Sequence, residues 1–127
     1  MINKIFLEIL SIIIGFIDYS NKKKIEHFLK KKFKDKNLNL IDIGSHKGET
    51  INLFLKNFNI QKIFAFEPNI KLFNLLNKKK YDYKKVKLFN CGVGINEGNL
   101  DLNIMMDSSS STFNTINLES KYYKKKK

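Results

Sequence analysis

The chain has 127 residues, of which 43% are hydrophobic, and these values favour one globular domain over a disordered chain. Its net charge is +12, and all 24 basic residues are lysines. Arginine, which makes bidentate contacts with bases and phosphates, is absent, so we predict no nucleic-acid partner. The single cysteine, Cys91, excludes a disulfide framework and is typical of a reducing, cytoplasmic compartment. The separation of His27 from His46 argues against zinc.

Residues 1–36 predict an N-terminal helical extension. Residues 5–17 are the most apolar segment, but 13 residues are too few to span a bilayer. The polar residues in and beside this segment recur at helical spacing and form one narrow stripe: Lys4, Glu8, Ser11, Gly15 and Asp18. We expect Ser20 to cap a second helix that continues to about Lys34.

Three interpretations of residues 1–34 remain open. The first is a helical hairpin packed against the main domain or against a partner subunit. The second is peripheral contact with an anionic membrane, helped by Lys22–Lys24 and Lys30–Lys32. The third, a cleaved signal or a membrane span, is disfavoured because only Lys4 precedes the apolar run.

From residue 37 the pattern changes to strands that alternate with helices. Apolar runs predict strands at 38–43, 62–66 and 86–89. Helical periodicity predicts helices at 48–58 and 70–79. This order predicts an α/β fold with a parallel sheet and flanking helices.

The pattern changes again after the third predicted strand. Leu100, Leu102 and Ile104 alternate with polar residues after a turn at 96–99. We therefore expect an antiparallel ribbon over 93–104 at an edge of the sheet. Residues 107–112 are expected to form a polar loop.

The candidate chemistry lies at the predicted carboxyl ends of the first two strands, where parallel sheets bind ligands. Gly44 stands where the first strand must turn, and Gly48 stands where the next helix begins, so backbone can approach a ligand closely there. Asp42 could orient this loop or meet a cationic group. Glu67, at the end of the second strand, can accept hydrogen bonds from both hydroxyls of a ribose.

A nicotinamide dinucleotide site is the obvious rival, and its Gly-x-Gly-x-x-Gly spacing fails here. Counting from Gly44, the other two glycine positions hold His46 and Glu49. A phosphate-binding loop of the Gly-x4-Gly-Lys-Ser/Thr type is also missing. A nucleoside with a positively charged, phosphate-free tail suits the acids better, and S-adenosylmethionine is such a ligand.

The motifs together resemble the FkbM family of methyltransferases over about residues 38–118. They occur in the family's order, at residues 41–49, 66–69, 90–94 with 97–98, and 108–111. The resemblance implies a class I, Rossmann-like fold that uses S-adenosylmethionine. It also implies O-methylation of a sugar or natural-product hydroxyl, so the expected partner is a small-molecule or glycan acceptor.

The resemblance also implies roles for individual residues. Gly44, Ser45 and Gly48 match the loop that touches the methionine part of the cofactor. Asp42 matches the acidic anchor of that loop, and Glu67 matches the acid that binds the ribose.

Two further features of the resemblance leave alternatives open. Asn90 lies near the expected position of the adenine, or is a turn residue that satisfies local backbone. The serines at 108–111 match the family's last motif, or form a solvated loop.

The family continues with a fourth strand carrying an Asp-Val-Glu-Gly-like motif, and nothing after Leu118 resembles it. Residues 37–127 are therefore expected to be the N-terminal half of a methyltransferase domain, truncated after the third strand and an edge hairpin. No catalytic residue can be named, and the first strand is left as an apolar edge that favours self-association. An inactive fragment, or a basic membrane-associated interaction module, is the alternative.

Overall fold

The computed structural model describes residues 4–105, 111–115, 117 and 119, with the backbone alone at 4–13 and 16. The predicted polar loop at 107–112 therefore lies largely outside the described residues. Six elements follow one another along the chain: α1 (Lys4–Lys32), β1 (Asn37–Ile43), α2 (Glu49–Asn57), β2 (Asn59–Phe66), α3 (Ile70–Lys78) and β3 (Val86–Phe89).

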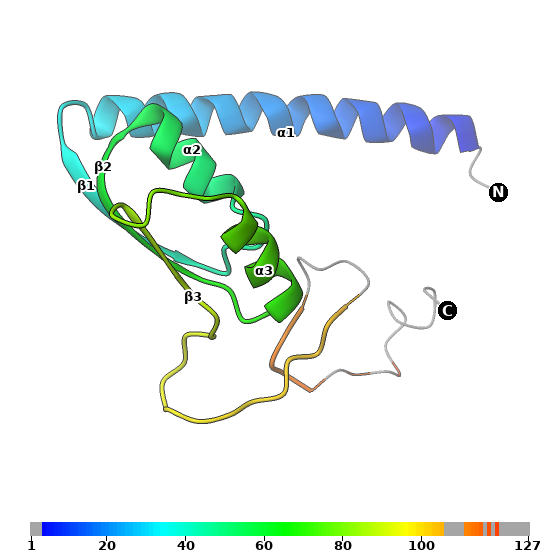
Figure 1. Cartoon of the computed structure of the whole chain (residues 1–127). Coiled ribbons are helices and arrows are strands. Elements are labelled where there is room, and N and C mark those ends of the chain that lie inside the picture. The colour runs from blue at the N-terminus through cyan, green and yellow to red at the C-terminus, as the bar shows by residue number, and fades with distance from the viewer. Residues whose placement is uncertain (1–3, 106–110, 116, 118, 120–127) are drawn as a thin grey trace.

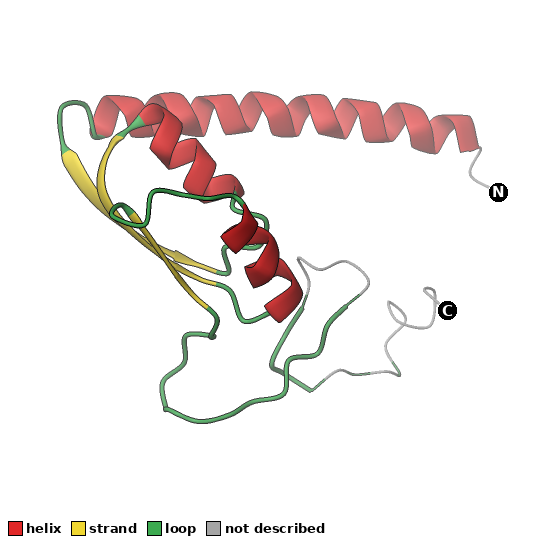
Figure 2. Cartoon of the chain, in the orientation of Figure 1, coloured by secondary structure: helices red, strands yellow, loops and turns green. Residues whose placement is uncertain are grey.

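The three strands form one parallel sheet in the order β1-β2-β3 (Figure 2). The predicted α/β class and parallel sheet are confirmed. Because successive right-handed crossovers in this order place their helices on the same face, α2 and α3 cover one side of the sheet (Figure 1). β1 lies at an edge, as expected.

The hydrophobic core lies between that face and the two helices. Its buried members come from α2, α3, β2 and β3: Ile51, Ile60, Ile63, Ala65, Leu76 and Val86. On α2, the rings of Phe54 and Phe58 stack at 4.8 Å beside this core. At the start of α3, the Asn69 side chain accepts the Lys71 N–H at 3.0 Å and caps the helix.

β2 begins three residues earlier than the pattern predicts, at Asn59 instead of Lys62. The pairing with β1 shifts register between Leu38 and Asn39, which face Ile60 and Lys62. Gln61 is thus an extra residue, and the bulge breaks the alternation that a strand pattern relies on.

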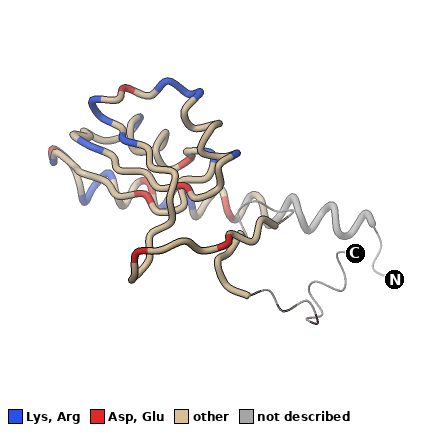
Figure 3. Tube along the Cα trace, turned by 60° about the horizontal axis from the view of Figure 1, so that its bottom comes forward, with Lys and Arg blue, Asp and Glu red and all other residues tan. Residues whose placement is uncertain are grey.

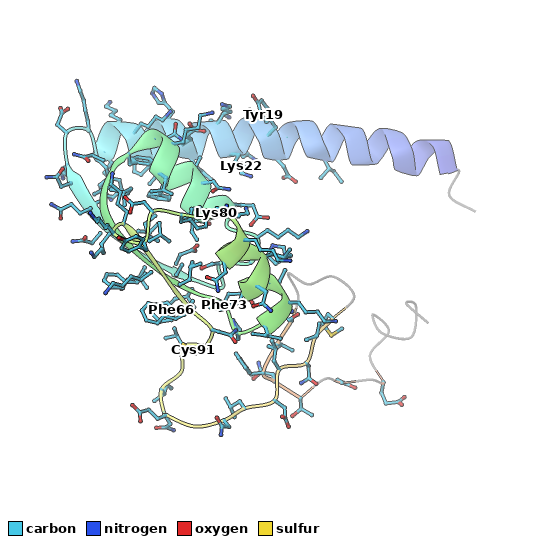
Figure 4. The ribbon with its side chains drawn as sticks, viewed as in Figure 1. Tyr19, Lys22, Phe66, Phe73, Lys80 and Cys91 are labelled. Atoms are coloured by element: carbon cyan, nitrogen blue, oxygen red, sulfur yellow. The ribbon has the colours of Figure 1, made fainter. Side chains whose placement is uncertain are left out.

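The second face of the sheet carries no helix among the described residues. Ile41 and Ile43 are 66% and 62% exposed there. Phe66 lies on the side of the sheet away from α3 (Figure 4), and its ring stacks on Phe89 at 4.9 Å. With Phe64, whose ring is 6.5 Å from that of Phe89, these five residues form what we call the open sheet face.

The helical hairpin predicted for residues 5–34 is wrong, because α1 is one continuous helix of 29 residues. Asp18, Ser20 and Asn21 cost only a few tenths of a kcal/mol each inside a helix, and neither glycine nor proline follows them before Lys32. Ser20 therefore continues the helix instead of capping a new one. α1 runs along one border of the molecule, with α2 and the sheet on one side of it (Figure 1).

The antiparallel ribbon predicted over 93–104 is also wrong. The described residues 93–105 form no strand, and Leu100 is 74% exposed. One isolated antiparallel bridge joins Asn103 to Thr112, through hydrogen bonds of 2.9 and 3.1 Å. Two-stranded pairings are marginal without a hydrophobic face to bury, so the alternation of leucines was not sufficient here.

Candidate functional site

The loop between β1 and α2 is tied to the end of β2. The N–H groups of Gly44 and Ser45 both donate to the Phe66 carbonyl, at 2.9 and 3.0 Å. Gly48 closes the loop by donating its N–H to the Ser45 carbonyl at 2.7 Å. Gly44, His46 and Gly48 have positive φ angles of 79°, 48° and 79°. The loop is thus a tight turn beside the second strand end.

The two glycines have different physical roles. A Cβ added to Gly48 would lie 2.5 Å from Tyr81 Oη and 2.8 Å from Leu76 Cδ2, so this glycine lets the loop pack against α3 and the segment after it. A Cβ on Gly44 would meet nothing within 4 Å. Gly44 therefore leaves open space at the end of β1, where a ligand can approach the backbone.

Glu67 is the buried acid at the end of β2, only 5% exposed. Its Oε2 accepts the His46 N–H at 2.7 Å, and its Oε1 accepts the Asn69 N–H at 2.9 Å. The carboxylate thereby joins the β1–α2 loop to the start of α3. Each carboxylate oxygen has a second lone pair, so it can still accept a hydrogen bond from a ligand hydroxyl.

Asp42 lies at the end of the neighbouring strand, and its Oδ2 is buried without a hydrogen-bond partner among the described residues. Burial raises the pKa of this carboxyl, the nearby Ser45 hydroxyl lowers it, and the negative charges of Glu49 and Glu67 raise it further. A buried carboxylate oxygen without a donor is costly, so this atom is suited to a cationic or hydrogen-bonding ligand group.

Two predicted site residues have mainly architectural contacts. Ser45 is 3% exposed, and its hydroxyl donates to the Asp42 carbonyl at 3.1 Å. The Asn90 side chain donates to the carbonyls of Glu67 at 2.8 Å and Pro68 at 3.2 Å. The Asn90 side chain thus satisfies backbone carbonyls, as a turn residue would. These carbonyls lie at the end of β2, however, and not in the turn that Asn90 itself belongs to.

A pocket of about 220 Å³ opens at the carboxyl ends of the strands. Its lining combines the strand ends with the segment after β3: Ile43, Gly44, Phe66, Glu67, Pro68, Cys91, Gly92, Val93, Leu102, Ser111 and Phe113. Of the predicted site residues, only Gly44 and Glu67 line it. Cys91 lines the pocket and is exposed.

Sequence reasoning missed the contribution of Leu102 and Phe113 to this pocket. A Cβ on Gly92 would lie 2.8 Å from the Phe113 ring, so Gly92 allows that ring to lie against the backbone after β3. The glycines at 92 and 94 are visible in the sequence. The partner ring is not, because it belongs to no periodic element.

The charge of the segment after β3 differs from that of the whole chain. Residues 88–120 contain no lysine but four acids: Glu97, Asp101, Asp107 and Glu119. Figure 3 shows lysines elsewhere on the molecule, and none along the described part of this segment. Together with Asp42 and Glu67, this distribution favours a cationic ligand over a phosphate.

No cluster of three or more metal-ligating side chains occurs within the part of the chain that the structure describes. No protein-family model, no curated protein and no solved structure matches this chain.

Proposed function

We propose that this chain binds S-adenosylmethionine at the carboxyl ends of its strands and provides the donor site of an O-methyltransferase. The observation that carries the proposal is the pair of acids at the ends of two adjacent strands, together with the open space at Gly44. One of these acids, Asp42, has a buried oxygen without a partner among the described residues. The acceptor class we propose is a hydroxyl of a small molecule or a glycan.

Each part of the cofactor has a chemical counterpart in the site. Glu67 accepts hydrogen bonds from the ribose hydroxyls, in addition to the two backbone N–H groups that it already holds. Asp42 meets the ammonium group of the methionine part. Phe66 and Phe113 supply apolar walls against which a flat base can pack.

The pocket size agrees with partial enclosure of the cofactor. A volume of about 220 Å³ is below the roughly 300 to 1,000 Å³ of sites that enclose a whole ligand. The nucleoside part therefore occupies the pocket, and the methionine part lies over the loop from Gly44 to Gly48. This arrangement leaves the sulfonium methyl group accessible to an acceptor.

The reaction depends on the alignment of the two reactants more than on acid–base or nucleophilic groups of the protein. A lone pair of the acceptor oxygen forms a bond to the methyl carbon while the carbon–sulfur bond breaks and its electrons return to sulfur. The products are the methyl ether and S-adenosylhomocysteine, and the hydroxyl proton leaves to a base or to water. Holding the two reactants in line can account for much of the rate enhancement.

Calorimetric titration of the full chain tests the proposal. We expect S-adenosylmethionine and S-adenosylhomocysteine to bind, and ATP and NAD to bind at least about tenfold more weakly, because the carboxylates of Asp42 and Glu67 repel their phosphates. Glu67→Ala should weaken S-adenosylmethionine binding at least about tenfold, since it removes charge-assisted hydrogen bonds to the ribose.

Glu97→Ala is the matched control, because Glu97 is an exposed acid in the lysine-free segment but does not line the pocket. It should bind the cofactor as the unmodified chain does. Circular dichroism must show that every sample is folded. A folded chain that gives no binding heat with S-adenosylmethionine, or that binds ATP equally well, contradicts the proposal.

A further inference from the structure

α1 carries an apolar face that no other element covers in the part of the chain that the structure describes. Ile14, Ile17, Ile25 and Phe28 are 49%, 52%, 60% and 59% exposed. At about 100° per residue they fall within one sector of about 80° of the helix, which also holds Asn21 and Lys32 and which we call the outer face of α1. Large apolar side chains grouped in this way mark an interaction surface, unlike single exposed ones.

The opposite side of α1 is the side turned toward the domain. Glu26 and Lys30 of α1 line a groove together with Asn52 and Lys56 of α2. Within α1, the Glu26 carboxylate pairs with Lys30 at 2.8 Å and with Lys23 at 3.9 Å. The domain side of this half of the helix is thus polar and partly charge-neutralised, and the outer face is left to a different partner.

Lysines lie along one flank of the outer face. Residues 18–32 contain six lysines and two acids; Glu26 is on the domain side, and Asp18 lies beside the outer face by helical position. Lys24 and Lys31 lie on the other flank by helical position, whereas Lys22 lines the groove on the domain side. Lys32 lies 5.8 Å from the centre of the Phe28 ring, which shows a cation within reach of the apolar surface. Long lysine stems can bury their methylenes while the ammonium groups stay at a polar boundary.

Position in the molecule makes this face accessible to an extended surface. α1 forms one border, and the sheet, α2 and α3 all lie on its other side (Figure 1). No helix in the described chain is long and apolar enough to cross a bilayer. A surface that accepts apolar side chains to a shallow depth and attracts flanking cations is the boundary of an anionic lipid bilayer.

We propose that α1 docks the protein on an anionic membrane, with its outer face in the boundary between headgroups and acyl chains. A second copy of the chain is less suited to the same face, because it would bring two lysine-flanked helices of like charge together. An anionic lipid surface, in contrast, attracts the same lysines. This inference is independent of the cofactor site, which lies at the strand ends.

Co-sedimentation of the full chain with vesicles tests the proposal. Binding should be strong to phosphatidylcholine vesicles containing phosphatidylglycerol, weaker to pure phosphatidylcholine, and reduced by added salt. The paired change Lys24→Gln and Lys31→Gln should weaken anionic binding by roughly fivefold per lysine. The paired change Ile17→Gln and Phe28→Gln, which keeps the charge, should weaken it at least about tenfold.

Matched controls make the same chemical changes elsewhere. Lys71→Gln with Lys78→Gln removes two exposed lysines from α3, and Ile95→Gln with Leu100→Gln removes two exposed apolar side chains from the segment after β3. Each control should change vesicle binding by less than about twofold, because neither lies on α1.

Three results would overturn the proposal. One is equal binding to charged and neutral vesicles, or none to either. The second is binding that falls with the lysine changes but not with Ile17→Gln and Phe28→Gln, which indicates attraction without insertion. The third is that Ile17→Gln with Phe28→Gln converts an oligomer to a monomer in sedimentation velocity while vesicle binding is unchanged. That result would assign the outer face to a second copy of the chain.

Discussion

Among single residues, Asp42 is held in the site at an energetic cost. Its buried Oδ2 lacks a partner among the described residues, and burial raises the pKa of the carboxyl. A raised folded-state pKa means that the protonated form stabilises the fold at low pH. That contribution is lost as the pH rises through the folded-state pKa, so at neutral pH the charged Asp42 disfavours the folded state.

Asp42→Asn is therefore expected to stabilise the free protein near pH 7, by no more than about 1 kcal/mol because the partly exposed group is screened by solvent. The same variant should lose affinity for S-adenosylmethionine, since its amide cannot neutralise the ammonium group. Urea unfolding from pH 3 to 8 checks the first part: the stability difference should vanish toward the acidic end, where Asp42 is protonated. A variant that is less stable at pH 7 would contradict this account.

Gly48 and Gly44 allow a second residue-level prediction. Both have a left-handed backbone, so alanine costs about 1 kcal/mol at either position. At Gly48 the added methyl group also meets Tyr81 Oη at 2.5 Å. We expect Gly48→Ala to lower the free energy of unfolding by about 3 kcal/mol, and Gly44→Ala by only about 1 kcal/mol.

Urea denaturation monitored by circular dichroism measures both values. Tyr81→Phe provides the control, because it removes the atom nearest to the new methyl group and should recover part of the Gly48→Ala loss. Equal losses of unfolding free energy at the two glycines would contradict this account, because they would show that Tyr81 and Leu76 move away from the added methyl group at no energetic cost.

At the scale of elements, α1 and β2 show the limits of local patterns in opposite ways. In β2 the bulge at Gln61 hides the first three residues of a strand of eight. In α1 the polar residues around Ser20 suggest a break that the helix does not make. A short polar stretch costs little inside a helix, whereas an extra residue in a strand moves every later side chain to the other face.

The continuity of α1 can be measured by spin labels at positions 14 and 28, with Cys91→Ser to remove the free thiol. One uninterrupted helix places the two backbones about 21 Å apart, at 1.5 Å per residue. A hairpin would bring the labels to roughly 10 Å. Labels at 17 and 28 serve as a ruler control and should lie about 17 Å apart in the helix.

For the whole molecule, the sheet is covered on one side only within the described residues. Parallel sheets are normally buried on both faces, and here Ile41 and Ile43 of the edge strand β1 are mostly exposed. β1 spans Asn37–Ile43 without a lysine or proline to block pairing with another strand. The free edge and the open sheet face together favour self-association.

We expect sedimentation velocity to show concentration-dependent self-association of the full chain. Ile41→Lys with Ile43→Lys should shift it toward monomer without loss of secondary structure, because both side chains point away from the core. Ile95→Lys, on a fully exposed residue outside the sheet, is the control and should leave the equilibrium unchanged. A monomer at every concentration would contradict the expectation.

Much of the fold was readable from the sequence because it rests on local periodicity. The apolar runs that end in Asp42 and before Glu67 identified two adjacent parallel strands, and β3 (Val86–Phe89) was predicted to the residue. Gly44 and Glu67 were assigned to a shared ligand site on the same grounds, and both line the pocket. These features depend on residues that are near one another along the chain.

Only the tertiary structure decided which surfaces meet and which stay uncovered. It brought Phe113 onto Gly92, left Asp42 Oδ2 without a donor among the described residues, and turned Glu26 toward α2 so that Ile25 and Phe28 face outward. Such outcomes depend on contacts between segments far apart in sequence, and local propensity carries no information about those contacts.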